Sequence, residues 1–175
     1  MSYKFIPEHV DPIRYAEQDL SIQGLVKIAE LHRLSALILP STDDIHVHLQ
    51  FGVDEQGVIF LKGRLTVKLT LQCQRCMEPF IYEIMPDFTL GIVKTLDEAD
   101  ALPSYYEPVL MEEGRLSLST LIEDEVILNL PIIAKHELEH CKVKTPLAGI
   151  DSTLQEVKNP FQVLESLKVK KKDKA

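Results

Sequence analysis

The stretch from Thr70 to Phe80 has the sequence TLQCQRCMEPF, and it decides how the chain can fold. A run of alternating apolar and polar residues ends here in a Cys-x-x-Cys turn, and Pro79 precedes a second apolar run. Such alternation is the period of a half-buried strand. The stretch therefore predicts a corner where one long strand ends and the next begins.

The same alternation predicts the strands on both sides of this corner. Residues 45–53 and 65–73 alternate strictly, and a hairpin turn is expected at 54–57, where Gly57 can adopt a positive φ. A third strand is expected from about 80 to 93, bent near Pro86, and Gly63 is expected to mark a bulge. The three strands form an antiparallel meander, which we expect to curl toward a barrel.

Helices are expected near both ends of the chain, so the predicted fold class is α+β. Residues 1–40 are expected to be mostly helical, with a strand-like interruption at 20–24 where Gly24 could turn the chain. Residues 95–115 are expected to be irregular. Ser117 can begin a helix that Pro131 ends, and residues 159–168 favour a last short helix. We expect one domain over residues 1–168, with a flexible loop at 142–158 and a disordered lysine-rich tail at 169–175.

Charge is unevenly distributed along the chain. The formal net charge is −8, and nine of the acidic residues lie between Asp97 and Glu125, where Arg115 is the one basic residue. An acidic body disfavours nonspecific binding of RNA or DNA. The acidic segment, including the Glu123-Asp124-Glu125 cluster, is expected to be solvated surface; the alternative is a docking face for a basic protein such as a ribosomal protein.

The sequence favours a cytoplasmic protein without a membrane partner. No stretch approaches the roughly 18–20 apolar residues that span a bilayer, and the first residues lack the pattern of a signal peptide. Three cysteines, an odd number, argue against a secreted disulfide framework and leave free thiols or a metal site.

The cysteines allow two interpretations. Cys73, Cys76 and Cys141, with His140 as the predicted fourth ligand and His136 as the alternative, are enough for a closed zinc site. The second Cys-x-x-Cys of a zinc ribbon is missing, so three reduced thiols are the slightly favoured interpretation.

Enzymatic interpretations are weaker than either of these. Residues 136–140 match the His-Glu-x-x-His pattern of metallohydrolases, but the short pattern needs a helix and a third ligand. A thiol oxidoreductase at Cys73 and Cys76 would need a helix after the Cys-x-x-Cys pair, whereas here the pair joins two strands. No catalytic residues are therefore predicted.

The block LQCQRCMEPF at residues 71–80 resembles the signature of the YceD family, the large ribosomal RNA subunit accumulation proteins. Other blocks agree in order along nearly the whole chain. They are Asp11-Pro12-Ile13-Arg14, Ala101-Leu102-Pro103, Tyr106-Glu107-Pro108, Glu123-Asp124-Glu125, Leu130-Pro131, Glu139-His140-Cys141, Asn159-Pro160-Phe161 and Ser166-Leu167-Lys168.

This resemblance implies a non-enzymatic bacterial factor in the synthesis, processing or stability of large-subunit rRNA. Its partner would be the rRNA itself or a ribosomal or processing protein. Some branches of the family carry more cysteines near the C-terminus, whereas this chain has only Cys141 there. Arg75, between the two cysteines of the turn, is the predicted binding residue of the corner.

Overall fold

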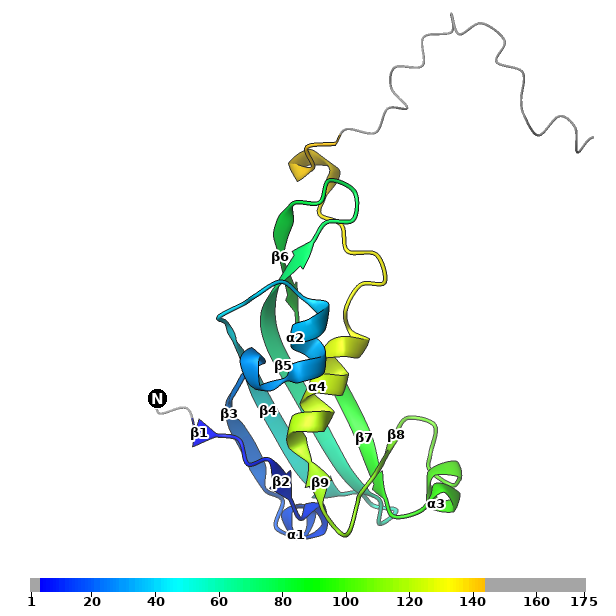
Figure 1. The fold of residues 1–175 in the computed structure, drawn as a ribbon. Helices are drawn as coiled ribbons and strands as arrows, with labels where there is room; N and C mark the ends of the chain where they lie inside the picture. Colours follow the sequence, from blue (N-terminus) through cyan, green and yellow to red (C-terminus); the bar gives the residue numbers. More distant parts are fainter. Residues whose placement is uncertain (1–3, 144–175) are drawn as a thin grey trace, which may run out of the picture. The chain divides into compact units, whose positions relative to one another are not determined.

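The computed structural model describes residues 4–143 (Figure 1). Nearly all of the predicted loop at 142–158, the last predicted helix and the lysine-rich tail lie outside the described residues. No helix in the described part of the chain is long and apolar enough to cross a membrane.

A seven-stranded sheet is the centre of the described fold. Its strands are β1 (Lys4–Phe5), β3 (Ser21–Lys27), β4 (Asp44–Val53), β5 (Ile59–Gln72), β6 (Pro79–Ile84), β7 (Asp87–Val93) and β8 (Glu107–Leu110). The order is β1-β3-β4-β5-β7-β8, and β6 pairs with β5 alongside this path. Within residues 4–143 the sheet is open, with β1 and β8 at its edges, so the expected curl toward a barrel does not occur.

The predicted meander is confirmed, with one refinement. β4 and β5 are antiparallel. Besides β4, β5 pairs with two further strands, one along each half of its length. Residues 60–64 pair with β7 and residues 67–72 pair with β6. Pro86 lies between these two partners, and its carbonyl accepts a hydrogen bond of 3.0 Å from the Leu65 amide. The predicted bend is thus the point at which one expected strand divides into two.

Gly63 does not form the expected bulge. It pairs in regular register with Leu49 on β4 and with Phe88 on β7. The Phe88 ring lies over Gly63, where an added Cβ would be 2.0 Å from the nearest ring atom. The glycine is therefore explained by the space that this ring occupies.

The N-terminal region is less helical than expected. Its helical elements are α1 (Pro12–Glu17), the 3-10 turn η1 (Ile28–Glu30) and α2 (His32–Leu37). Asp11 caps α1 by accepting hydrogen bonds from two amides of its first turn, as its sequence predicts. The strand-like alternation at 20–24 belongs to β3, which continues through Lys27, and Gly24 pairs with Val47 instead of turning the chain.

Residues 95–115 are also more regular than expected. They contain helix α3 (Leu96–Asp100) and β8, which pairs with β7 in parallel. A short second sheet joins β2 (His9–Val10) to β9 (Leu116–Ser117). Parallel pairing between strands separated by a crossover has no local sequence signal, which is why the alternation pattern missed β8.

The predicted helix after Ser117 is confirmed as α4 (Leu118–Leu128). The Ser117 hydroxyl accepts a hydrogen bond from the Thr120 amide, and the helix ends three residues before Pro131. α4 and α2 lie over the same face of the sheet (Figure 1). Their buried side chains, including Leu34 and Ile122, join those of β4 and β5 in one hydrophobic core.

Glu123 departs from the prediction of solvated charge. Its carboxylate accepts hydrogen bonds from the amides of Arg33 (2.7 Å) and Leu34 (3.0 Å), at the first turn of α2. Arg33 Nε adds a bond of 2.8 Å. No side chain of α2's own N-cap residue supplies such a bond. A buried glutamate on α4 therefore caps α2 and joins the two helices.

Candidate metal centre

The corner after β5 is closed by its own backbone. The Cys73 amide donates to the Glu78 carbonyl at 2.9 Å, and the Met77 amide donates to the Cys73 carbonyl at 2.8 Å. Met77 has a φ of 63°, in the left-handed region, so the chain reverses within a few residues before β6 begins. This tight reversal places the thiols of Cys73 and Cys76 together.

The segment that follows α4 is hydrogen-bonded to this corner. The Gln74 amide donates to the Ala134 carbonyl at 2.8 Å, and Arg75 Nη2 donates to the His136 carbonyl at 3.0 Å. The Phe80 ring meets the His136 ring edge-on, with centroids 5.5 Å apart. The 3-10 turn η2 (Leu138–His140) then leads into Cys141. The segment thus delivers a histidine and a third cysteine to the first two.

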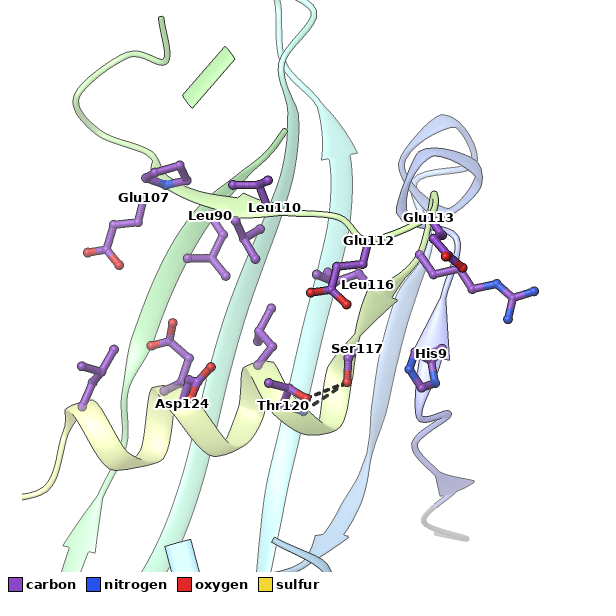
Figure 2. Close-up of a pocket in the computed structure, with 16 residues that line it drawn as sticks. His9, Leu90, Glu107, Leu110, Glu112, Glu113, Leu116, Ser117, Thr120 and Asp124 are labelled. Atoms are coloured by element: carbon purple, nitrogen blue, oxygen red, sulfur yellow. Dashed lines mark hydrogen bonds between the residues drawn. The ribbon is translucent and has the colours of Figure 1, made fainter. Parts of the chain in front are cut away.

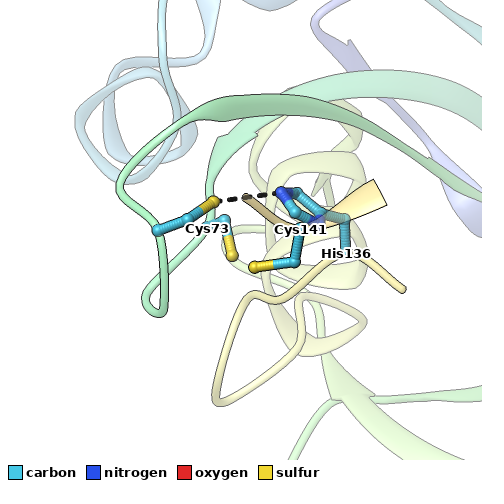
Figure 3. Close-up of side chains that lie close together, drawn as sticks. Cys73, His136 and Cys141 are labelled. Carbon is cyan, nitrogen blue, oxygen red and sulfur yellow. Dashed lines mark hydrogen bonds between the residues drawn. The ribbon is translucent and has the colours of Figure 1, made fainter. Parts of the chain in front are cut away.

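Four possible metal ligands meet at this point. The ligand atoms of Cys73, Cys76, His136 and Cys141 all lie within 4.8 Å of one another. Figure 3 shows Cys73, His136 and Cys141 converging on one spot. With bonds of 2.0–2.3 Å, the ligand atoms around tetrahedral zinc lie roughly 3.3–3.8 Å apart, so a small contraction of the cluster would reach that geometry. The four residues lie close enough to bind a metal ion.

The cluster is also enclosed in the way that a structural metal site is. Cys73 and Cys141 are buried, while Cys76 and His136 are half-buried. Structural zinc sites use four protein ligands, whereas catalytic sites keep one position open for water or substrate. A three-cysteine, one-histidine set fills all four positions.

The pKa values of the two turn cysteines are shifted in opposite directions. Burial alone would raise the pKa of Cys73, but hydrogen bonds from the amides of Cys76, Arg75 and His136 lower it to about 6. The Glu78 amide favours the Cys76 thiolate, yet burial and the neighbouring Cys73 and Cys141 raise the pKa of Cys76. Backbone amides stabilise the Cys73 thiolate. A second thiolate in the cluster would need a nearby cation to balance its charge.

Arg75 supplies positive charge at the edge of the cluster. Its Nε donates to the Cys141 sulfur at 2.9 Å, while its Nη2 holds the His136 carbonyl. Three thiolates and one neutral imidazole around Zn²⁺ carry a net charge of about −1, which a guanidinium can offset. Arg75 thus lies in the corner and contacts two residues of the returning segment, His136 and Cys141.

The structure separates the two histidines that the sequence offered as a fourth ligand. His136 is in the cluster, with Nε2 3.1 Å from the Cys76 sulfur. His140, the ligand preferred from the sequence, is exposed at the end of η2 and is not in the cluster. The side chains of adjacent residues in a bent chain point in different directions, so His140 is poorly placed to share an ion with Cys141. The sequence holds no signal that separates the two histidines, because the packing of the Phe80 ring on His136 is a tertiary contact.

The metallohydrolase pattern at residues 136–140 does not form the helix that its chemistry needs. Only Leu138–His140 are helical, as a single 3-10 turn, and His136 lies before it. Two histidines four residues apart share one face only on an α-helix. His136 instead joins the three cysteines.

Comparison with known proteins identifies the family. The family model described as "Large ribosomal RNA subunit accumulation protein YceD" matches residues 61–168. A protein of Haemophilus influenzae with the same description is 37% identical over 169 residues, which cover 94% of this chain and 97% of the relative. The chain belongs to the YceD family.

The part matched by the YceD model contains the corner, the returning segment and all four clustered residues. No solved structure matches the chain.

Proposed function

We propose that this chain is a non-enzymatic bacterial factor that acts in large ribosomal subunit biogenesis, in the synthesis, processing or stability of large-subunit rRNA. The observation that carries the proposal is the match to the Haemophilus influenzae protein, whose name states accumulation of large-subunit rRNA, over 94% of the chain. The site of action is the cytoplasm. The chain acts on the rRNA directly or through a ribosomal or processing protein.

The character of the cysteine cluster supports a binding role over catalysis. A closed four-ligand centre gives a substrate no free position on the metal. A thiol oxidoreductase at Cys73 and Cys76 would need its low-pKa thiolate to be accessible, whereas Cys73, the cysteine with the lowered pKa, is fully buried.

Deletion of the gene tests this proposal. We expect the cellular ratio of large-subunit to small-subunit rRNA to fall in the deletion strain, and free large subunits to decline in a sucrose-gradient profile. A plasmid copy of the gene should restore both quantities. An unchanged ratio together with an unchanged subunit profile would refute the proposed function.

We further propose that Cys73, Cys76, His136 and Cys141 hold one zinc ion that supports the fold. The donor set carries this proposal, because zinc prefers thiolate and imidazole in a closed tetrahedral site. Bound zinc would join the corner between β5 and β6 to residues 136–141, which the core anchors only indirectly. Its binding free energy would then contribute to folding.

Native mass spectrometry of protein purified without chelators tests the zinc proposal. We expect about one zinc per chain in the wild type and in His140→Asn, and its loss in His136→Asn. The two substitutions are chemically identical and lie four residues apart, so they control for each other. A metal-free, stably folded wild type, or equal zinc content in both variants, would exclude this site.

A further inference from the structure

A groove of about 940 Å³ lies between α4 and the edge strand β8, away from the cysteine cluster (Figure 2). Glu107 on β8 and Asp124 on α4 stand on its opposite sides. Arg115 is the one lysine or arginine that lines it, against five carboxylates. These belong to Glu107, Glu112, Glu113, Asp124 and Glu125.

Glu125 is the residue that distinguishes this groove from ordinary acidic surface. It lines the groove but is only 8% exposed. Among the described residues its carboxylate forms no hydrogen bond or salt bridge, in contrast to Glu123 and Asp124, which bind Arg33. Burial, with the nearby charges of Glu107 and Asp124, raises the pKa of Glu125. The Glu125 oxygens keep some solvent contact, since no side-chain oxygen among the described residues is fully buried without a partner. A largely desolvated carboxylate without a charged partner costs free energy, which a cation entering the groove would recover.

The spacing of the acidic groups favours an extended cation over a metal ion. Within residues 4–143, the cysteine cluster is the one set of three or more His, Cys, Asp or Glu ligand atoms close enough to share an ion. The carboxylates of the groove are too far apart to chelate a single divalent cation. They instead suit several cationic groups spaced along a chain.

Apolar and main-chain features define the rest of the ligand. Leu110 is 44% exposed and Leu128 is 75% exposed, and both line the groove. β8 is an edge strand that pairs with β7 alone in the described part of the chain. An edge strand can pair with an extended peptide, whose alternate side chains then point in opposite directions.

We propose that the groove between α4 and β8 binds an extended segment of a partner protein in which lysine or arginine alternates with apolar residues. The cationic side chains meet Glu107 and Glu125, and the apolar ones cover Leu110 and Leu128. RNA does not suit this groove, because its phosphates would face five carboxylates. The inference concerns a surface separate from the cysteine cluster.

Fluorescence anisotropy with the full-length protein tests this inference. The probe is a labelled eight-residue peptide of alternating lysine and leucine, titrated at low ionic strength. Glu107→Gln/Glu125→Gln removes two groove carboxylates, and Glu17→Gln/Glu55→Gln removes two exposed carboxylates elsewhere, with the same change in net charge. We expect the first pair to weaken binding about tenfold or more and the second to change it less than about twofold.

Equal weakening by the two variant pairs would overturn the inference, since binding would then follow net charge alone. Absence of peptide binding to the wild type would overturn it as well. So would an RNA octanucleotide that binds in place of the peptide and loses affinity in the groove variant. All of these outcomes leave the proposed role in rRNA accumulation standing, because the readout is peptide binding by the isolated protein.

Discussion

Arg75 links the two parts of the cysteine cluster through one side chain. Its guanidinium binds the Cys141 sulfur and the His136 carbonyl at once, and both lie at least 60 residues further along the chain. A planar guanidinium offers several donors in fixed directions, which a lysine ammonium cannot reproduce. Arg75 is thus a positioning residue for the centre rather than a ligand.

Replacement of Arg75 should therefore weaken metal binding while leaving all four ligands in place. We expect Arg75→Lys to lower zinc affinity about 10- to 100-fold, the range for residues that orient metal ligands. Competition with a chromophoric chelator measures this affinity. Lys135→Ala, which removes an exposed cation from the same region, is the control and should change the affinity little. Equal affinities in wild type and Arg75→Lys would show that the guanidinium does not position the centre.

Glu123 is the second residue with a function that its position in the sequence conceals. Its pKa is lowered, because hydrogen bonds from the Leu34 amide and from Arg33 outweigh the effect of burial. A carboxyl with a lowered folded-state pKa stabilises the protein above its unfolded pKa of about 4.3, and this contribution disappears as the pH falls through the folded-state value.

We expect Glu123→Ala to lower the free energy of unfolding by about 1–3 kcal/mol at pH 7, since it leaves two amides of α2 without a partner. The difference from wild type should shrink as the pH falls below about 4. Asp124→Ala is the matched control: it removes a half-exposed ion pair with Arg33 and should cost less than about 1 kcal/mol. Urea unfolding at pH 7 and at a pH below about 4 measures the free energy of unfolding of the wild type and of both variants.

At the scale of single residues, the sequence picked out most of the residues that meet at the corner but could not choose the histidine. Cys73, Cys76, Cys141 and Arg75 were identified from residue type and spacing, and the structure brings all four to one corner. The fourth member, His136, could not be chosen over His140 by spacing. That choice depends on how residues 134–141 pack against Phe80 and Gln74, which is a tertiary contact.

Among the structural elements, β5 organises the sheet, and Gly63 is its most constrained position. The sequence predicted β4, β5 and the strands after the corner from alternation alone, because one face of each is buried. It misassigned Gly63 as a bulge, since a glycine in a strand can mark either a bulge or a close approach. It missed β8 because only parallel pairing with β7 defines that strand.

Gly63→Ala should destabilise the protein through its contact with Phe88. The added methyl group would overlap the ring, and displacing the ring should cost about 1–3 kcal/mol. In a Phe88→Leu background the same substitution should cost less, because the smaller side chain leaves room. A double-mutant cycle by urea unfolding measures this coupling. Equal costs in both backgrounds would mean that the ring does not explain the glycine.

At the scale of the whole described molecule, acidic residues that are neighbours in the sequence lie in different environments. The acidic residues from Asp97 to Glu125 were expected to form one solvated surface, but in the folded protein they have different roles. Glu123 caps a helix, whereas Glu107 and Glu125 line the groove between α4 and β8. Only tertiary structure could separate these roles, because they depend on which element each acid faces.

We propose that this YceD-family chain supports accumulation of large-subunit rRNA and needs its cysteine–histidine centre to do so. The most direct measurement is the ratio of large-subunit to small-subunit rRNA in a deletion strain that carries wild type, His136→Ala or His140→Ala. We predict a lowered ratio in the deletion strain, restored by wild type and by His140→Ala but not by His136→Ala. A deletion strain with a normal ratio would contradict the role in rRNA accumulation, and full restoration by His136→Ala would contradict the need for the centre.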